Sequence, residues 1–370
     1  MSRTLVIRFG SLGDLCLLAW SLSGQDAAAR AAGTPRPRIT LAVKAAYAPL
    51  LANVPGIDTV APLRGPRWRD LWQLARLLRR ERFDTVLDAH GVLRSRLLCL
   101  LLGRRPTRRI VKDTAARLAL LRARHAHGAR RTPLPPALQR TMLRRFDEVV
   151  SPVGTAAVET TPHGVGPGAV LLAEGHGCAL RPRGPANGPR PARIGLAPGA
   201  RWDTKRWPPG HWAELLRRLR EVTSLPVEIF LGARERAWFA TGPLADAAAA
   251  AGNVTVAADL RLPELARRLG ACRVVVTNDS GLLHLAEAAG TPVLALFGPT
   301  VRAFGYFPLL PDSRVLEREL ACRPCSRNGR RPCWRGDLAC LVEIGPDAVL
   351  AALRTLPGLA DAGTPGVSGD

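Results

Sequence analysis

The sequence predicts two doubly wound α/β domains that face a central cleft. Three features carry this prediction. Short apolar runs alternate with helix-length amphipathic segments, a Pro- and Gly-rich stretch interrupts the alternation, and the chain has 370 residues. Alternating strands and helices are typical of a parallel sheet with helices on both faces, and this length suits two domains better than one.

The first half of the chain begins the alternation at once. An apolar strand-like run leads into the turn "GSLGD" (10–14), where two glycines let the backbone turn into a helix. The N-terminal domain is placed at residues 1–165. Strands are predicted over 4–9, 38–43 and 84–91, and helices over 15–25 and 69–83.

The alternation stops and then restarts around a segment rich in proline and glycine. The stretch "RPRGPANGPRPAR" has the composition of a linker, and we predict a linker region over 166–193. The second domain is placed at 194–345, with a C-terminal helix and frayed tail over 346–370. Strands are predicted over 193–199, 226–233, 273–279 and 292–298, and helices over 208–222, 262–272, 280–290 and 345–356.

Positive charge is concentrated in one part of the chain. Arg and Lys number 53 against 30 Asp and Glu, a net charge of +23. Between residues 64 and 145 there are 22 basic and five acidic residues, so 22 minus five gives +17 for this segment. Such a field attracts polyanions or an anionic membrane surface. A solvated basic face without a partner is the alternative.

Composition excludes a membrane-spanning protein and disfavours a nucleic-acid-binding one. No uninterrupted run of about 18 apolar residues is present. The opening "MSRTLVIRFG" is too short and too soon interrupted to be a signal peptide, so the expected compartment is the cytoplasm. Side chains for base stacking are scarce, with two Tyr and eight Phe. A basic nucleic-acid-binding protein is therefore the less favoured alternative, and no nucleic-acid partner is expected.

The stretch "VVVTNDSGLLHLAEAAG" (274–290) predicts an anion-binding site. An apolar strand ends there in small polar residues that open a helix, and ligands of open α/β sheets bind beyond the carboxyl ends of the strands. Free N–H groups and the helix dipole favour an anion at this point. Ser280 and Gly281 allow close approach, and His284 lies on the same helical face one turn later. The alternative is an ordinary N-cap with a surface histidine.

Four segments together resemble glycosyltransferase family 9, the ADP-heptose:lipopolysaccharide heptosyltransferases. Their order and spacing agree with the family, and the resemblance runs from residue 3 to about 355. Each segment alone is weak, and the set is specific. The segments are "VIRFGSLGDL" (6–15), "VLDAHGVLRS" (86–95), "APGARWDTKRWPPGHW" (197–212) and "TNDSGLLHLAEAAGTPVLALFGPT" (277–300).

The resemblance implies a fold of GT-B type, with the acceptor on the N-terminal domain and the donor mainly on the C-terminal one. It also implies an inverting, metal-independent transfer of a heptose or related sugar from an ADP-sugar to a lipopolysaccharide core or lipid A precursor. A relative that uses another nucleotide sugar or acceptor is the alternative. The sequence contains no Asp-x-Asp pair of the kind that holds a metal-bound nucleotide sugar. No cofactor is expected for catalysis.

Asp14 is the candidate general base. A single-displacement sugar transfer needs a base for the acceptor hydroxyl and positive charge for the leaving diphosphate. Asp14 follows the first predicted strand, and the base proposed for the family falls at this position. The alternative is that Asp14 only caps its own helix.

The resemblance assigns the donor contacts to the C-terminal domain. Lys205, one of three lysines in the chain, matches a family lysine that contacts the donor's phosphate or sugar. Relatives often have Thr or Ser near Arg201, which would compensate through a bidentate contact. Leu260 matches a position that packs on adenine, and a ribose-holding acid falls near Glu235. The predicted donor set is Arg201, Lys205, Leu260, Asp279, Ser280, Gly281 and His284.

Arg94 and Lys112 are the candidates for holding the acidic groups of the acceptor. Arg94 belongs to the turn that ends a predicted strand, and the family geometry directs it toward the cleft. The strongly basic segment of the same domain predicts peripheral association with the inner face of the cytoplasmic membrane, because each basic residue near an anionic surface adds attraction.

The eight cysteines fall into two groups of four. The scattered group is expected to be buried, inert thiols; it consists of Cys16, Cys99, Cys178 and Cys272. The clustered group is compatible with a structural, non-catalytic zinc site, although its last two members are six residues apart, unlike the usual short chelate. This group consists of Cys322, Cys325, Cys333 and Cys340.

Overall fold

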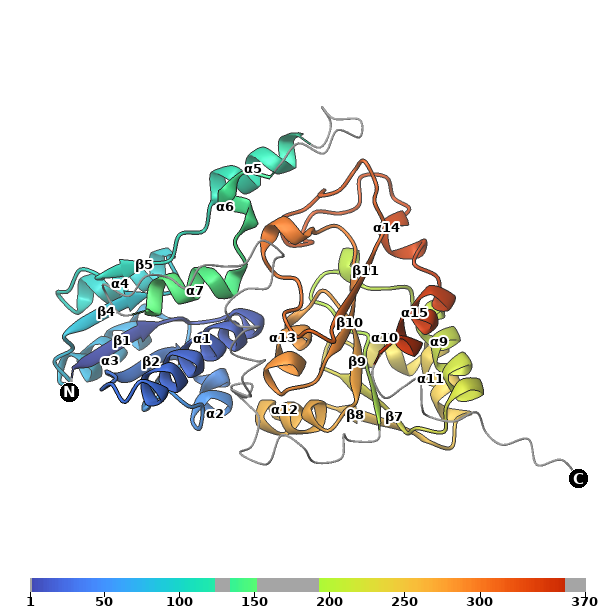
Figure 1. Ribbon diagram of the computed structural model, residues 1–370, viewed down its shortest axis with the longest axis horizontal. Helices are drawn as coiled ribbons and strands as arrows, with labels where there is room; N and C mark the ends of the chain where they lie inside the picture. Colours follow the sequence, from blue (N-terminus) through green and yellow to red (C-terminus); the bar gives the residue numbers. More distant parts are fainter. Residues whose placement is uncertain (1, 124–133, 152–192, 357–370) are drawn as a thin grey trace, which may run out of the picture. The chain divides into compact units, whose positions relative to one another are not determined.

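The computed structural model describes residues 2–123, 134–151 and 193–356. These residues form two parallel sheets in two compact units (Figure 1), which confirms the two doubly wound α/β domains. Residues 114–123 and 134–139 group with the second unit, whereas the sequence placed them in the first domain. The predicted linker up to residue 192 and the tail after residue 356 lie outside the described residues.

The first unit is built on a five-stranded sheet with the order β3-β2-β1-β4-β5. Its described pairs are parallel, and β1 lies at the centre with Leu5 opposite Thr40 on one side and Val86 on the other. The strands are β1 (Arg3–Ile7), β2 (Arg38–Lys44), β3 (Thr59–Leu63), β4 (Thr85–Asp88) and β5 (Arg108–Arg109). The helices are α1 (Leu12–Ala31), α2 (Ala48–Leu51), α3 (Trp68–Arg79), α4 (Leu93–Leu101) and α7 (Met142–Val150), with the 3₁₀ turn η1 (Ala45–Tyr47).

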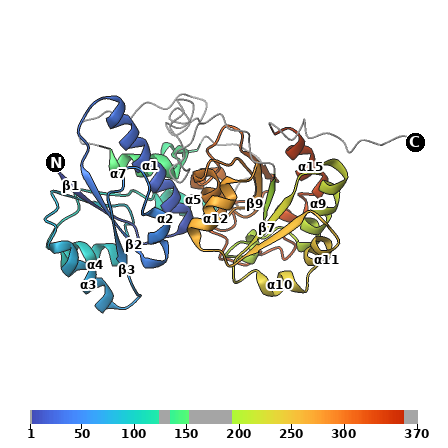
Figure 2. The ribbon, with the colours of Figure 1, turned by 90° about the horizontal axis from the view of Figure 1, so that it is seen from below.

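Helices cover the first sheet in two layers, as Figure 2 shows. The amphipathic helix α3 buries Leu71, Leu74, Ala75 and Leu78 on the sheet, and α4 packs beside it. Helices α1 and α7 pack together. This arrangement follows from the crossovers: the chain runs from β1 toward one edge and from β3 back toward the other, and right-handed crossovers then place helices on opposite faces.

The second unit is built on a six-stranded parallel sheet with the order β11-β10-β9-β6-β7-β8. Its strands are β6 (Ile194–Ala197), β7 (Val227–Leu231), β8 (Val254–Ala258), β9 (Val274–Asn278), β10 (Val293–Phe297) and β11 (Arg314–Glu317). Its helices are α5 (Thr114–Ala123), α6 (Pro136–Gln139), α9 (Pro209–Val222), α10 (Arg236–Ala240), α11 (Pro243–Ala249), α12 (Leu262–Gly270), α13 (Gly281–Ala288), α14 (Ala339–Val342) and α15 (Pro346–Arg354), with the 3₁₀ turns η2 (Asp203–Lys205) and η3 (Arg302–Phe304). Among the helices of the described residues, none is long and apolar enough to cross a bilayer.

The sequence predicted the inner strands of both sheets and missed the outermost ones. The missed strands are β3, β5, β8 and β11, which lie at the four sheet edges. Strand β3 carries Pro62, and β11 is nowhere fully buried. Strands β6, β7, β9 and β10 are buried throughout. Burial on both faces requires a continuous apolar run, and an edge strand does not.

Candidate functional site

Each sheet has one topological switch point, where neighbouring strands lead the chain in opposite directions. In the first sheet it lies between β1 and β4, and in the second between β6 and β9. Ligands of doubly wound sheets bind beyond the carboxyl ends of the strands at such points. The loops after these strands contain His90, Lys205 and Asp279, and Asp14 lies in the first turn of α1, just after β1, so the switch points are the candidate sites.

In the second unit, a lysine, an aspartate and a threonine from three separate loops meet. Lys205 Nζ lies 2.5 Å from Asp279 Oδ2, and Thr300 Oγ1 donates to the same oxygen over 2.5 Å. The side chains of Lys205 and Asp279 are 13% and 9% exposed. An ammonium group has three donors, and this contact uses one of them. Lys205 can therefore also serve an anion beside the start of α13.

Asn278 joins the two loops of this site. Its Nδ2 donates to the Pro198 carbonyl over 2.7 Å, and its Oδ1 accepts from the Trp207 backbone N–H over 3.0 Å. The side chain is fully buried. One amide therefore fixes the end of β9 against both ends of the loop that carries Lys205. The sequence analysis gave Asn278 no role, because an amide that bridges two loops leaves no local pattern.

Ser280 and His284 lie at the start of α13. Ser280 Oγ accepts from the Leu282 backbone N–H over 3.2 Å, as an N-cap does. His284 is only 4% exposed, and its ring centroid lies 6.0 Å from that of Tyr306. The alternative to an anion-binding site was an ordinary N-cap with a surface histidine. The N-cap is present, but the histidine is not on the surface, because His284 is buried.

The cysteine-rich segment supports the Lys205 loop. Thr204 Oγ1 donates to the Gly329 carbonyl, and Gly329 has φ of +86°. A Cβ on Gly329 would lie 2.8 Å from Lys205 Cγ, so only glycine lets the lysine side chain pass. Nearby, the Arg323 guanidinium donates to the carbonyls of Gly298 at 2.5 Å and Thr300 at 2.8 Å. The segment thus positions both Lys205 and Thr300.

The sequence left a structural zinc open at the clustered cysteines, and the structure shows no metal site there. None of the four forms a disulfide, and among the described residues no group of three or more His, Cys, Asp or Glu could hold a metal ion. Cys340 lies in α14 and belongs to the hydrophobic core. Burial raises its pKa to about 11, and the nearby Cys325, Cys322 and Cys333 raise it as well while Arg323 lowers it. The segment packs against the turn after β10.

The scattered cysteines behave as predicted where the structure describes them. Cys16, Cys99 and Cys272 are buried and free. Burial raises the pKa of Cys99 to about 11 and that of Cys272 to about 12, and it raises the pKa of Cys16 further. These thiols are therefore poor nucleophiles at neutral pH. Cys178 lies outside the described residues.

Two further residues of the predicted donor set, Arg201 and Leu260, and the candidate ribose-holding acid Glu235 lie in loops that follow β6, β8 and β7. Glu235 accepts from the Gly232 backbone N–H over 3.1 Å, and its carboxyl group packs against Gly199 in the loop after β6. Leu260 is half-buried and follows β8. Arg201 is exposed, its guanidinium 5.1 Å from the centroid of the Trp202 ring. Within the described part of the chain, no hydrogen bond or ion pair joins Arg201 to Lys205 or Asp279.

In the first unit, Asp14 both caps α1 and pairs with a buried arginine. It occupies the third position of the helix, where Ser11 Oγ donates to Asp14 Oδ2 over 2.7 Å. Arg8 Nη2 lies 2.5 Å from the same oxygen, and the two side chains are 5% and 10% exposed. Arg8 also donates to the Ala89 carbonyl over 2.7 Å. The guanidinium thus ties the loop after β1 to the loop after β4.

His90 joins this group, and the sequence analysis did not identify it. Its Nδ1 accepts from the Phe9 backbone N–H at 3.4 Å. The pKa of His90 is lowered to about 4, first by burial and then by the nearby charges of Arg8 and Lys112, while Asp14 and Asp88 act in the opposite direction. The imidazole is therefore neutral at pH 7. Both Arg8 and His90 stand inside motifs that the sequence had singled out, but a motif does not show which of its members meet.

The two predicted acceptor residues have different surroundings. Lys112 is an electrostatic neighbour of His90 and passes beside Gly91. Arg94 is half-buried and donates to the Gly65 carbonyl over 2.7 Å and to the Arg67 carbonyl over 3.4 Å. Lys112 therefore lies with the Asp14 group, whereas Arg94 holds the loop that leads into α3.

Glu287 anchors the loop that faces His284, and it gives the second unit a pH-dependent stability. Its carboxyl group accepts from the backbone N–H groups of Leu309 and Leu310 and from Ser313 Oγ, at 2.8 to 3.1 Å. Burial raises its pKa from 4.5 to about 7, although these hydrogen bonds lower it. The folded state thus holds a proton that the unfolded state releases, and stability falls as pH rises from about 4.5 to 7.

We expect Glu287→Gln to remove this loss, because the amide keeps an acceptor oxygen and carries no charge. Relative to the wild type, the variant should gain on the order of 3 kcal/mol of unfolding free energy between pH 4.5 and 7. Urea unfolding across this range measures the difference. Asp147, whose pKa burial raises to about 6, contributes equally to both proteins and cancels. Parallel stability curves would show that Glu287 does not titrate in this window.

Comparison with known proteins agrees with this geometry. The family model described as glycosyltransferase family 9 (heptosyltransferase) matches residues 71–333. Lipopolysaccharide heptosyltransferase 1 of Pseudomonas aeruginosa is 30% identical over 337 residues, covering 87% of this chain and 86% of the relative. The solved structure of E. coli heptosyltransferase WaaC with ADP has a TM-score of 0.64 and 22% identity, covering 95% of this chain and 99% of that one. WaaC with ADP-2-deoxy-2-fluoro heptose gives the same TM-score and coverage at 21% identity.

Proposed function

This chain belongs to glycosyltransferase family 9 and is a glycosyltransferase, and from that premise we propose that it moves a heptose from ADP-heptose to a lipopolysaccharide core or lipid A precursor, with inversion. The observation that carries the proposal is the meeting of Lys205, Asp279 and Thr300 beside the start of α13. A cation and free helix N–H groups at a switch point suit a diphosphate. The similar protein WaaC has been solved with ADP and with ADP-2-deoxy-2-fluoro heptose.

The donor is proposed to lie along the second switch point. Its diphosphate oxygens accept hydrogen bonds from Lys205 Nζ and from the backbone N–H groups of Ser280 and Gly281. His284 lies beside the diphosphate, one turn into the helix. Asp279 holds the lysine in place by its 2.5 Å contact. Glu235, beside Gly199, suits the ribose hydroxyls, and Leu260 and Arg201 complete the proposed set on the adenine and phosphate sides.

The reaction is proposed as a single displacement with Asp14 as base. The Asp14 carboxylate takes the proton of the acceptor hydroxyl, and that oxygen bonds to the anomeric carbon of the donor. The bond from this carbon to the diphosphate oxygen breaks, and ADP leaves with the electron pair. Attack opposite the leaving group inverts the configuration. The buried Arg8 beside Asp14 favours the ionised carboxylate that a base requires.

The acceptor is proposed to bind in the first unit. Lys112, next to the Asp14 and His90 group, is placed to meet an acidic sugar or a phosphate. Arg94 is proposed to act indirectly on the acceptor. It donates hydrogen bonds to the Gly65 and Arg67 carbonyls and so fixes the loop before α3. We also propose that the basic segment between residues 64 and 145 associates peripherally with an anionic membrane, where such acceptors reside.

The direct test is transfer itself. Purified enzyme with ADP-heptose and a Kdo-bearing lipid A acceptor is expected to yield the heptosylated product by mass spectrometry, and the same acceptor with UDP- or GDP-sugars is expected to yield none. Preference for another nucleotide sugar, with no product from ADP-heptose, would contradict the proposed donor. No product from any donor would contradict the acceptor instead.

Turnover is further expected to survive EDTA. The charge of the leaving diphosphate is met by Lys205 and helix N–H groups, and the sequence has no Asp-x-Asp pair to hold a metal-bound nucleotide. Initial rates with and without chelator, after metal-free purification, measure this. Loss of activity that only Mg²⁺ or Mn²⁺ restores would show that transfer requires a metal.

A further inference from the structure

Helices α3 and α4 carry large apolar side chains on their solvent side. Leu93 and Leu100 are each 74% exposed, Leu77 is 60% exposed, and Trp72 and Leu97 are 43% and 42% exposed. The two helices lie side by side over one face of the first sheet (Figure 2). Their opposite sides are already buried in the core, through Leu71, Leu74, Ala75 and Leu78 of α3 and Ser95, Leu98 and Cys99 of α4. The exposed side chains are therefore a second apolar face, which a monomeric protein rarely leaves uncovered.

Arginines surround these apolar side chains and lack acidic partners. Arg76, Arg79 and Arg80 extend from α3, and Arg96 extends from α4, with Arg104 and Arg105 just after it; all are exposed. Within the described residues no ion pair is recorded for any of them, although the arginines of α9 and α12 pair with Glu214 and Glu264. Asp70, the acid of α3 itself, is occupied in capping the helix through the Arg67 N–H at 2.8 Å.

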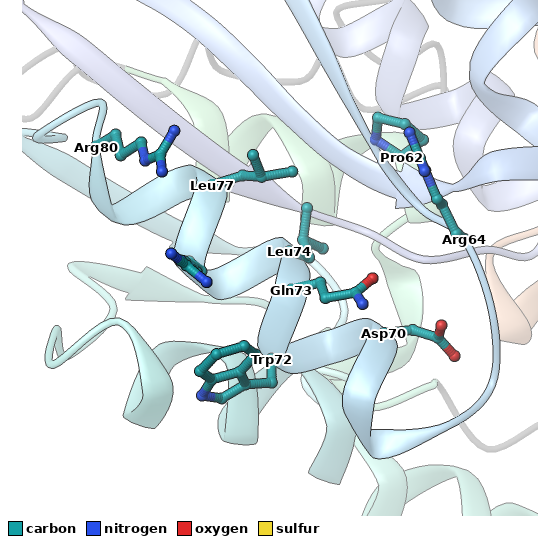
Figure 3. Close-up of a pocket in the computed structure, with 9 residues that line it drawn as sticks. Pro62, Arg64, Asp70, Trp72, Gln73, Leu74, Leu77 and Arg80 are labelled. Atoms are coloured by element: carbon teal, nitrogen blue, oxygen red, sulfur yellow. The ribbon is translucent and has the colours of Figure 1, made fainter.

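A hollow of about 450 Å³ lies along α3, beside Pro62 and Arg64 at the end of β3 (Figure 3). Trp72 and Leu77 give it an apolar wall, and Arg76 and Arg80 line it with positive charge. The Arg76 guanidinium lies 5.9 Å from the centroid of the Trp72 ring. Indole and guanidinium groups side by side suit the zone of a bilayer where headgroup phosphates meet acyl chains.

We propose that the solvent side of α3 and α4 is the surface by which this protein docks on an anionic lipid bilayer. Leucine and tryptophan side chains enter the boundary between headgroups and acyl chains, and the surrounding arginines bind headgroup phosphates. Charge complementarity selects the bilayer as the occupant, because arginines without a described ion pair lie on and just after the same two helices as the apolar side chains. The inference rests on the proposed function in one respect: a lipid-linked acceptor brings the enzyme to a membrane.

One triple variant and one double variant of the full-length protein test the surface. Arg76→Gln/Arg79→Gln/Arg80→Gln should lower partition onto phosphatidylglycerol-containing vesicles on the order of a hundred-fold, because each arginine contributes about five-fold near an anionic surface. Leu97→Ser/Leu100→Ser should lower it at least about ten-fold. Since these side chains are exposed, both variants are expected to keep the wild-type melting temperature. Cosedimentation at about 0.1 M salt measures the partition.

Matched controls remove the same groups elsewhere. Arg217→Gln/Arg220→Gln/Arg354→Gln removes equal charge from the exposed surface of the second unit, and Val256→Ser/Val342→Ser removes exposed apolar side chains there. Both controls should bind vesicles within about two-fold of wild type. A loss as large in the controls as in the α3 and α4 variants would overturn the surface, and so would equal wild-type binding to pure phosphatidylcholine vesicles.

A water-soluble acceptor without acyl chains separates this inference from the proposed function. The α3 and α4 variants should transfer heptose to it at the wild-type rate while losing vesicle binding. Vesicle binding without transfer would contradict the proposed function alone. Transfer without wild-type vesicle binding would contradict the docking surface alone. Stronger retention on duplex DNA than on anionic vesicles would assign the face to nucleic acid and overturn the bilayer.

Discussion

Asp14→Asn is expected to lower turnover by ~10²–10⁴-fold while leaving ADP affinity unchanged. The amide has nearly the shape of the carboxylate, so it can still accept from Ser11 Oγ as a helix cap. It cannot take a proton at neutral pH, and the acceptor hydroxyl then attacks without a base. ADP is proposed to bind in the other unit, so calorimetry with ADP reports on folding and donor binding independently of this residue.

The substitution also leaves the buried Arg8 without its carboxylate, and a lower melting temperature is therefore expected as well. Asp26→Asn separates the two effects. Asp26 lies on the same helix, is 2% exposed and pairs with Arg30 and Arg36, so it matches Asp14 in burial and charge but not in place. The control should lose stability and keep turnover. Turnover at the wild-type level in Asp14→Asn would remove Asp14 from the mechanism.

Lys205→Ala is expected to weaken ADP binding by about 2–4 kcal/mol, which corresponds to roughly 30- to 700-fold. The substitution removes the cation that meets the diphosphate and also the cation that neutralises Asp279. Asp279 is 9% exposed and would keep its hydrogen bond from Thr300, so a buried carboxylate without a neutralising cation would then face the diphosphate. Calorimetric titration with ADP measures the change, and Lys44→Ala, at an exposed lysine of the first unit, should leave affinity unchanged.

The double variant Lys205→Ala/Asp279→Asn tests the physical reason for that loss. Neutralising Asp279 removes the repulsion, so the double variant should bind ADP more tightly than Lys205→Ala alone, though less tightly than wild type. A second, smaller loss is expected for His284→Ala, because the histidine borders the proposed phosphate position. Unchanged ADP affinity in both Lys205→Ala and His284→Ala would exclude the start of α13 as the donor site.

The inner framework of both sheets follows from local sequence. Strands β6, β7, β9 and β10 are buried throughout and mostly apolar because helices cover both of their faces, and the hydrophobic effect favours such runs. Edge strands are less buried and do not require apolar residues at every position. Strand β11 (Arg314–Glu317) begins and ends on charged residues and has no fully buried position, so only its parallel pairing with β10 identifies it as a strand.

The sequence by itself also predicted which chemical groups belong to a site: Asp279 and His284 from the start of a helix where backbone N–H groups lack helical partners, and Asp14 and Lys205 mainly from the family resemblance. It could not determine which of them meet. Asp279 contacts Lys205, 74 positions earlier (279 minus 205), and Thr300, 21 positions later. Likewise Arg8 and His90 join Asp14 only because β1 and β4 are neighbours. Strand order brings these loops together, and strand order is set by packing of the whole sheet rather than by any local pattern. Likewise the spacing of the four clustered cysteines left a structural zinc open, and only the folded chain shows that Cys340 belongs to the hydrophobic core and that the described residues form no metal site.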